Sequence, residues 1–215
     1  MIIQNSVIFR NILWKDYPAL ERFMDAFTSG SRGDSAARRH LNRLSLYDSL
    51  RRATYARGAF LGSRLIGLIL GRCSTTPLHP KASWFRFYNI LALNKSPQGR
   101  YFYKTYRFFQ QTDQRLLSAC HEDFQGELLF IAVHPRFRRQ GIGLTLLYCF
   151  HTYMLGRGVR QIFLFTDSGC CCGFYDRQRF DRLCAFYWPD TKHRSYFGFY
   201  LYKFTYTSGS AVIYS

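Results

Sequence analysis

The chain has 215 residues, 47% of them hydrophobic and 19% aromatic, so it can bury a core and is not a disordered protein. The net charge is +17, and 24 of the 30 basic residues are arginines, which favours an anionic ligand or partner. No stretch has the pattern of a membrane span or of a secretory signal. The seven cysteines lack the spacing of a metal site. We therefore expect a reduced, cytoplasmic protein with no metal and no membrane contact.

Apolar periodicity and turn residues divide the N-terminal third into elements. We expect, in order, a strand at 7–9, a helix at 16–27, a helix after Asp34, and a hairpin with strands at 59–61 and 65–70 around a Gly62–Ser63 turn. Residues 32–64 contain eight arginines and two aspartates. A solvated face is the default interpretation of these charges, and a surface for an acidic substrate or partner is the alternative.

The pattern changes between residues 74 and 126, where aromatic residues are dense. We interpret this segment as an insertion or a substrate-side lid, with a strand at 84–93 and a helix at 101–117. The C-terminal part is predicted to form a strand at 127–133, a helix at 141–155, a strand at 161–166, a short helix at 171–179, and strands at 183–188 and 198–206. Strands alternating with helices indicate one α/β (α+β) domain over residues 1–215.

The segment IAVHPRFRRQGIGLTLL, residues 131–147, combines a strand, a basic loop, two glycines and a helix. Glycine at Gly141 and Gly143 lets a ligand approach the backbone closely, and N–H groups in the first turn of a helix have no acceptor within the helix. The positive end of the helix dipole adds to these donors. Together with Arg136, Arg138 and Arg139, they predict a site for a diphosphate.

The spacing Arg138-x-x-Gly141-x-Gly143 resembles the signature [RQ]-x-x-G-x-[GA] of the GNAT superfamily of acyl-coenzyme-A-dependent N-acetyltransferases. The resemblance is tight from residue 127 to 180 and rests on element order alone over residues 1–70. It implies a GNAT-like mixed, mostly antiparallel central sheet flanked by helices. It also implies an enzyme that moves an acetyl group from acetyl-CoA to a primary amine by direct attack in a ternary complex.

The resemblance also implies the coenzyme contacts. The pantetheine arm is expected along the strand backbone of Ile131, Ala132 and Val133. The pyrophosphate is expected on the loop and helix start, at Arg138, Arg139, Gln140, Gly141, Ile142, Gly143 and Leu144. Ser168 stands where the family often has an asparagine that contacts the pantetheine, and we include it in the coenzyme site.

Residues 166–180 resemble the family's strand-to-helix segment, in which a tyrosine, here Tyr175, commonly protonates the departing thiolate. A phenol with a pKa of ~10 can donate a proton to a thiolate whose conjugate acid has a pKa of ~8.5 or above.

The attacking amine must also lose a proton. Some family members use a glutamate near the start of the strand before the basic loop, and Glu127 holds that position. Period-two alternation places Glu127, Leu129, Ile131 and Val133 on one face, yet Glu127 lies far enough from Ile131 to need a bulge or a water relay. Water chains alone are the alternative.

Two departures from the family pattern support a rival interpretation. Ser168 could weaken a pantetheine contact, and Arg179, where the family has glycine, predicts a different chain reversal before Phe180. A non-catalytic acyl-CoA-binding sensor is therefore the alternative function. Binding of nucleic acid ranks last, because no nucleic-acid signature accompanies the charge. The run Cys170-Cys171-Cys172 is predicted to be buried by packing at a helix start. The acceptor amine and the formation of a homodimer are left open.

Overall fold

The computed structural model describes residues 6–27, 35–74, 83–190 and 195–207. Its elements are, in order, β1 (Val7–Asn11), η1 (Trp14–Asp16), α1 (Tyr17–Asp25), α2 (Ser35–Arg52), β2 (Tyr55–Leu61), β3 (Arg64–Cys73), α3 (Ser83–Asn94), α4 (Pro97–Ser118), β4 (Gly126–Val133), η3 (Pro135–Phe137), α5 (Ile142–Leu155), β5 (Gln161–Asp167), α6 (Cys172–Arg177), β6 (Asp181–Asp190) and β7 (Ser195–Thr205).

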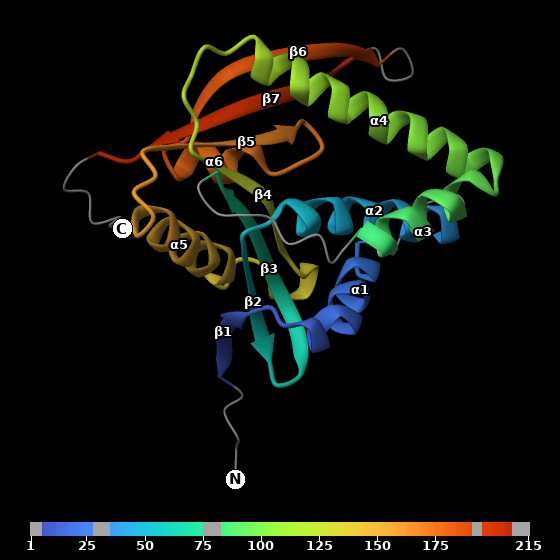
Figure 1. Cartoon of the computed structure of the whole chain (residues 1–215), viewed down its shortest axis with the longest axis horizontal. Coiled ribbons are helices and arrows are strands. Elements are labelled where there is room, and N and C mark those ends of the chain that lie inside the picture. Colours follow the sequence, from blue (N-terminus) through green and yellow to red (C-terminus); the bar gives the residue numbers. More distant parts are fainter. Residues whose placement is uncertain (1–5, 28–34, 75–82, 191–194, 208–215) are drawn as a thin grey trace.

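The strands form one seven-stranded sheet in the order β1-β2-β3-β4-β5-β7-β6. Neighbouring strands are antiparallel except for β4 and β5, which run parallel. The predicted mixed, mostly antiparallel sheet is therefore confirmed. The exception is informative, because β4 and β5 are joined by the crossover that contains the basic loop and α5 (Figure 1).

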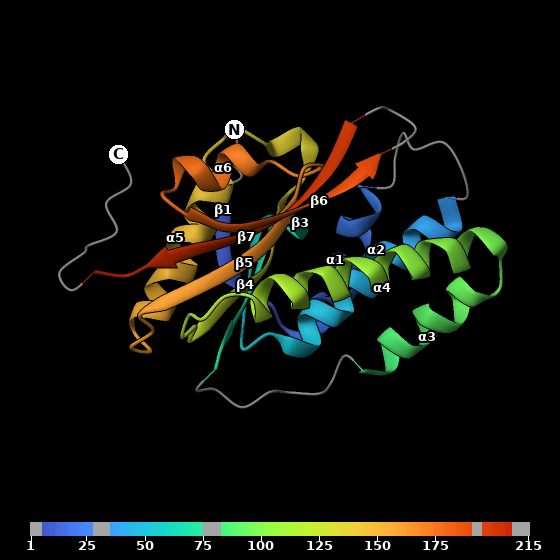
Figure 2. The same ribbon diagram turned by 90° about the horizontal axis from the view of Figure 1, so that it is seen from above.

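Helices cover both faces of the sheet (Figure 2). On one face α5 buries Leu146, Phe150 and Met154, which recur at helical spacing, against side chains of β3, β4 and β5. On the other face α1 and α2 pack on β2 and β3, and the C-terminal half of α4 packs on β5 and β7. The sheet thus separates the α5 side from the α2–α4 side.

Residues 84–93 form helix α3, so the predicted strand there is wrong. The side chains that face inward are Phe85, Asn89 and Leu93, four residues apart, and Phe85 stacks on Tyr47 of α2 at 4.9 Å between ring centroids. Burial of one helical stripe against α2 therefore outweighs the strand preference of the aromatic residues. Helices α3 and α4 both pack on α2, and the interpretation of residues 74–126 as an insertion or lid stays a prediction. None of the helices within the described residues has the length and apolarity needed to cross a membrane.

Candidate active site

The parallel strands β4 and β5 pair only at their beginnings. Their register joins Gly126 to Ile162 and Glu127 to Phe163 and then ends. Strand β4 stays paired to β3 as far as Val133, and β5 stays paired to β7 as far as Asp167. The two strands therefore diverge, and residues 128–133 of β4, called the open edge below, make no ladder with β5. An extended ligand can pair with backbone groups along such an edge.

A β-bulge lies at the start of the open edge. Leu70 pairs with Phe130 whereas Gly71 pairs with Leu128, so Leu129 is an extra residue. The bulge makes the predicted alternation wrong, because an inserted residue shifts every later side chain to the other face. Leu129 packs on the α1–α2 side, whereas Ile131 and Val133 pack on the α5 side. A bulge, one of the two features that the Glu127 hypothesis allowed for, is therefore present, and the catalytic role of Glu127 stays a prediction.

The basic loop after β4 presents donors to solvent. The side chain of Arg138 turns back, its Nε donating to the carbonyl of Val133 at 3.3 Å. Arg139 and Gly141 both have left-handed backbones, with φ of 60° and 77°, and α5 begins immediately after Gly141. Residues 138–141 are exposed at the positive end of this 14-residue helix. Backbone donors, helix dipole and guanidinium groups together fit a pyrophosphate.

The two loop glycines serve different purposes. A side chain at Gly141 would be strained by its positive φ. A Cβ at Gly143 would instead meet the side chains of Val133 at 3.5 Å and Phe174 at 4.0 Å, which is ordinary contact. Packing therefore does not demand glycine at Gly143. The same contacts show that β4, α5 and α6 converge at this point.

Tyr175 lies on α6, directly after the loop that follows β5. Its ring packs against those of Phe174, Phe180 and Tyr202 at 5.5 to 5.9 Å between centroids. Burial, followed by the negative charge that nearby Cys170 would carry if ionised, raises the pKa of Tyr175, so its phenol stays protonated at neutral pH. The hydroxyl of Tyr202 donates to Asp176 at 2.9 Å and helps to fix α6 on β7. The arrangement holds a protonated phenol in a fixed position.

The structure shows the backbone and contacts of Arg179 and Ser168, the two residues that depart from the family pattern. Arg179 adopts a left-handed backbone with φ of 60°, a conformation that favours glycine, and the predicted difference in chain reversal stays a prediction. The backbone N–H of Gly198 donates to the hydroxyl of Ser168 at 3.1 Å, and the Ser168 N–H donates to the Gly198 carbonyl at 2.9 Å. Ser168 thus extends the pairing of β5 with β7, and its pantetheine contact stays a prediction.

The cysteine run is more exposed than predicted. Cys170 and Cys171 are exposed, and Cys172 is half-buried, with its thiol donating to the carbonyl of Asp167 at 3.2 Å. Local desolvation nevertheless raises the pKa of Cys170 and of Cys172 above the usual thiol value. A raised pKa keeps these thiols protonated, which disfavours a nucleophilic role.

Glu127 lies on the α2–α4 side of the sheet, where it is 5% exposed. Its carboxylate pairs with Arg52 at the end of α2. Burial raises the pKa of Glu127, although the charges of Arg52 and Arg72 and the hydrogen bond from Arg52 act in the opposite direction. Glu127 is therefore a buried, partnered carboxylate beside the open edge.

A second carboxylate, Asp113 of α4, faces the same region and was missed by sequence reasoning. Burial raises the pKa of Asp113 to about 7, with further contributions from the negative charges of Asp167 and Glu127 and an opposing one from Arg52. The only signal in the sequence was that Asp113 is the single acidic residue between residues 83 and 118.

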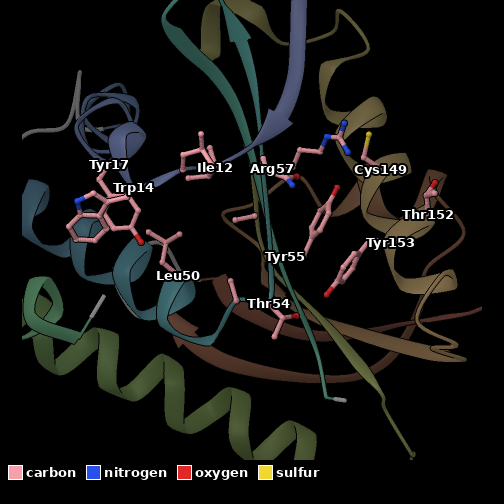
Figure 3. A pocket seen from close by; sticks show the side chains of 14 residues that line it. Ile12, Trp14, Tyr17, Leu50, Thr54, Tyr55, Arg57, Cys149, Thr152 and Tyr153 are labelled. Atoms are coloured by element: carbon pink, nitrogen blue, oxygen red, sulfur yellow. The ribbon is translucent and has the colours of Figure 1, made fainter. Parts of the chain in front are cut away.

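A larger cavity, of about 670 Å³, lies elsewhere (Figure 3). Trp14 and Leu50 line one side, and the stacked rings of Tyr55 and Tyr153, 4.6 Å apart, line the other. None of the predicted site residues lines this cavity. It lies beside β2 and α5, away from the open edge of β4, so its size alone does not make it the active site.

Comparisons with known proteins agree with this geometry. The model of the Acetyltransferase (GNAT) family matches residues 9–180. No curated protein sequence gives a significant match. The fold resembles the ribosomal-protein-S18-alanine N-acetyltransferase of Escherichia coli, with a TM-score of 0.55, 12% identity, and 98% of this chain and 100% of that chain covered. It also resembles the PaiA N-acetyltransferase of Thermoplasma acidophilum in complex with coenzyme A, with a TM-score of 0.55, 16% identity, and 94% and 99% covered.

Proposed function

Because this chain belongs to the acetyltransferase (GNAT) family and is therefore an acyltransferase, we propose that it acetylates a primary amine by direct attack on acetyl-CoA in a ternary complex. The observation that carries the proposal is the open edge of β4, which leads to the exposed arginines and the first turn of α5. This arrangement suits the binding of a long ligand that carries an amide-containing arm and a diphosphate.

The coenzyme contacts follow from the geometry of the open edge and the loop. The pantetheine amides pair with the backbone of Ile131, Ala132 and Val133, along the part of β4 that has no partner in β5. The pyrophosphate binds the segment from Arg138 to Leu144, where donors and positive charge are concentrated. A backbone N–H near Ile131, just beyond the bulge, polarises the thioester carbonyl, as an oxyanion site does.

Tyr175 is the proposed proton donor to the departing thiolate. Its raised pKa keeps the phenol protonated, and it lies on α6, which meets the start of α5 and the end of β4. The family resemblance implies Glu127 as the proton acceptor. Its pairing with Arg52 weakens this second assignment, because a carboxylate held by a guanidinium is a poorer base.

A coenzyme-binding sensor without activity loses support from the structure. Arg179 keeps the backbone conformation that glycine would have, and Ser168 is accommodated within the β5–β7 pairing. Neither departure disturbs the open edge or the start of α5. We therefore retain catalysis as the conclusion.

Initial-rate kinetics test the ternary complex. Coenzyme A thiol release is measured while acetyl-CoA and the fastest amine from a panel of small primary amines are both varied. Direct attack predicts double-reciprocal lines that intersect, because both substrates must be bound before any product leaves. Parallel lines would show a covalent acetyl-enzyme and would contradict the proposal.

A further inference from the structure

A cavity of about 320 Å³, called the charged pocket here, lies on the α2–α4 side of the sheet. It is lined by Ser45, Asp48, Ser49, Arg51, Arg52, Arg86, Tyr106, Gln110, Asp113, Glu127, Leu128, Leu129 and Phe165. These residues come from the end of α2, from α3 and α4, and from the strands where β4 and β5 diverge. The volume suits a small molecule rather than a protein surface.

The charged pocket extends to the point where β4 and β5 diverge, on the opposite side of the sheet from the proposed coenzyme site. Glu127, Leu128 and Leu129 form its wall at the bulge of β4, and Phe165 forms its wall on β5. The basic loop and α5 lie on the other face of the sheet (Figure 2). An acceptor in the pocket and a thioester on the open edge therefore meet where β4 and β5 separate.

The charged residues of the pocket are paired, with two exceptions. Arg86 pairs with Asp48, whose other oxygen accepts from the hydroxyl of Tyr106 at 2.6 Å, and Arg52 pairs with Glu127. Within the described part of the chain, Asp113 and Arg51 make no hydrogen bond or ion pair, and the Nε of Arg51 is buried. One negative and one positive side chain therefore remain for a ligand.

Asp113 is the stronger candidate for the proton acceptor, because Glu127 is paired with Arg52 whereas Asp113 has no ion-pair partner among the described residues. The groups that act on its charge are Glu127 of β4, Asp167 of β5 and Arg52 of α2. Asp48 and Arg86 also line the pocket, but they neutralise each other. With its pKa raised to about 7, Asp113 is ionised in a large fraction of molecules at neutral pH and is still basic enough to accept a proton.

Building on the proposed function, we propose that the charged pocket binds a small acceptor carrying both a primary amine and a carboxylate, with the ammonium at Asp113 and the carboxylate at Arg51. The ammonium passes one proton to Asp113, and the freed lone pair forms the N–C bond while the C–S bond breaks. Tyr175 gives its proton to the thiolate, and the second proton lost by nitrogen restores Tyr175. Asp113 releases its proton to water.

Matched pairs of probes test the assignment of Arg51. Glycine, γ-aminobutyrate and ε-aminohexanoate are compared with methylamine, propylamine and pentylamine, which lack only the carboxylate. For at least one pair, the wild-type kcat/KM for the amino acid should exceed that for the plain amine by about 10- to 100-fold, the effect of a charge-assisted hydrogen bond. Arg51→Gln should abolish this preference, so that the amino acid and the plain amine of each pair react with equal kcat/KM.

The pH dependence tests Asp113. The wild-type kcat/KM should rise with pH and level off above pH 7, where Asp113 is ionised. Asp113→Asn should lower kcat/KM at pH 7 by about 100- to 10,000-fold, and its rate should keep rising until the amine itself deprotonates near pH ~10. The control is Asp181→Asn, which changes an exposed aspartate on β6 and should behave as wild type. Affinity for acetyl-CoA, measured for each variant, shows that the fold is intact.

The remaining outcomes separate the two proposals. If Glu127→Gln shows the altered pH profile and Asp113→Asn does not, or if Asp113→Asn slows the reaction without changing the profile, Asp113 is not the base. If plain amines react as well as their amino acids, the pocket assignment fails and the proposed function stands. If no primary amine releases coenzyme A thiol, the proposed function fails, and the pocket assignment with it.

Discussion

Tyr175→Phe is expected to lower kcat for acetyl transfer by about 100- to 10,000-fold, the usual contribution of a positioned general acid, while the affinity for acetyl-CoA stays unchanged. The substitution removes only the hydroxyl, and the ring contacts with Phe174, Phe180 and Tyr202 remain. Thiol release measured at saturating acetyl-CoA gives kcat, and calorimetric titration gives the affinity.

The matched control is Tyr196→Phe, which removes a hydroxyl from a side chain that is 71% exposed on β7. This variant should keep the wild-type kcat. Full activity of Tyr175→Phe would mean that another group or water protonates the thiolate. Loss of acetyl-CoA affinity together with activity would instead assign Tyr175 a structural role.

Acidification from pH 6.5 to pH 4 is expected to remove about 3 kcal/mol of unfolding free energy through one buried histidine. His151 of α5 is fully buried, and burial lowers its pKa to about 3, compared with about 6.5 in the unfolded chain. Between these values the unfolded chain binds a proton that the folded protein does not. The contribution is fully present above pH 6.5 and is lost at up to about 1.4 kcal/mol per pH unit as the pH falls toward 3.

Chemical denaturation at a series of pH values measures this slope. His151→Gln removes the titrating group and keeps a polar partner for the hydroxyl of Tyr206, 2.6 Å from His151 Nδ1 in the wild type. This variant should lose stability more gently below pH 6.5, whereas His121→Gln, at an exposed site, should keep the wild-type slope. Equal slopes for wild type and His151→Gln would contradict a neutral, buried His151.

The loop and helix of the coenzyme site were predictable because their chemistry is local in sequence. Gly141 marks the left-handed residue before a helix, and the arginines around it are neighbours in the chain. The strands on either side carry continuous apolar runs, so β4, α5 and β5 were placed within one or two residues of their observed bounds.

Other features depend on contacts that the sequence pattern does not show. Residues 84–93 carry aromatic residues suited to a strand, and only the presence of α2 beside them selects the helix. The bulge at Leu129 arises from the register between β3 and β4, and no local signal marks it. The charged pocket joins Arg51, Arg86, Asp113 and Glu127 from four separate elements, so its unpaired charges appear only after the chain folds.

The most direct test of the account is calorimetric titration of the protein with acetyl-CoA at low and at high salt, with ATP as the control polyanion. A chain with a net charge of +17 attracts any phosphate, and such binding weakens steeply with salt. A site built from the open edge of β4 and the start of α5 predicts micromolar acetyl-CoA binding that greatly exceeds ATP binding and persists at high salt. Weak binding equal to that of ATP, and lost in salt, would contradict the coenzyme site and the proposed function with it.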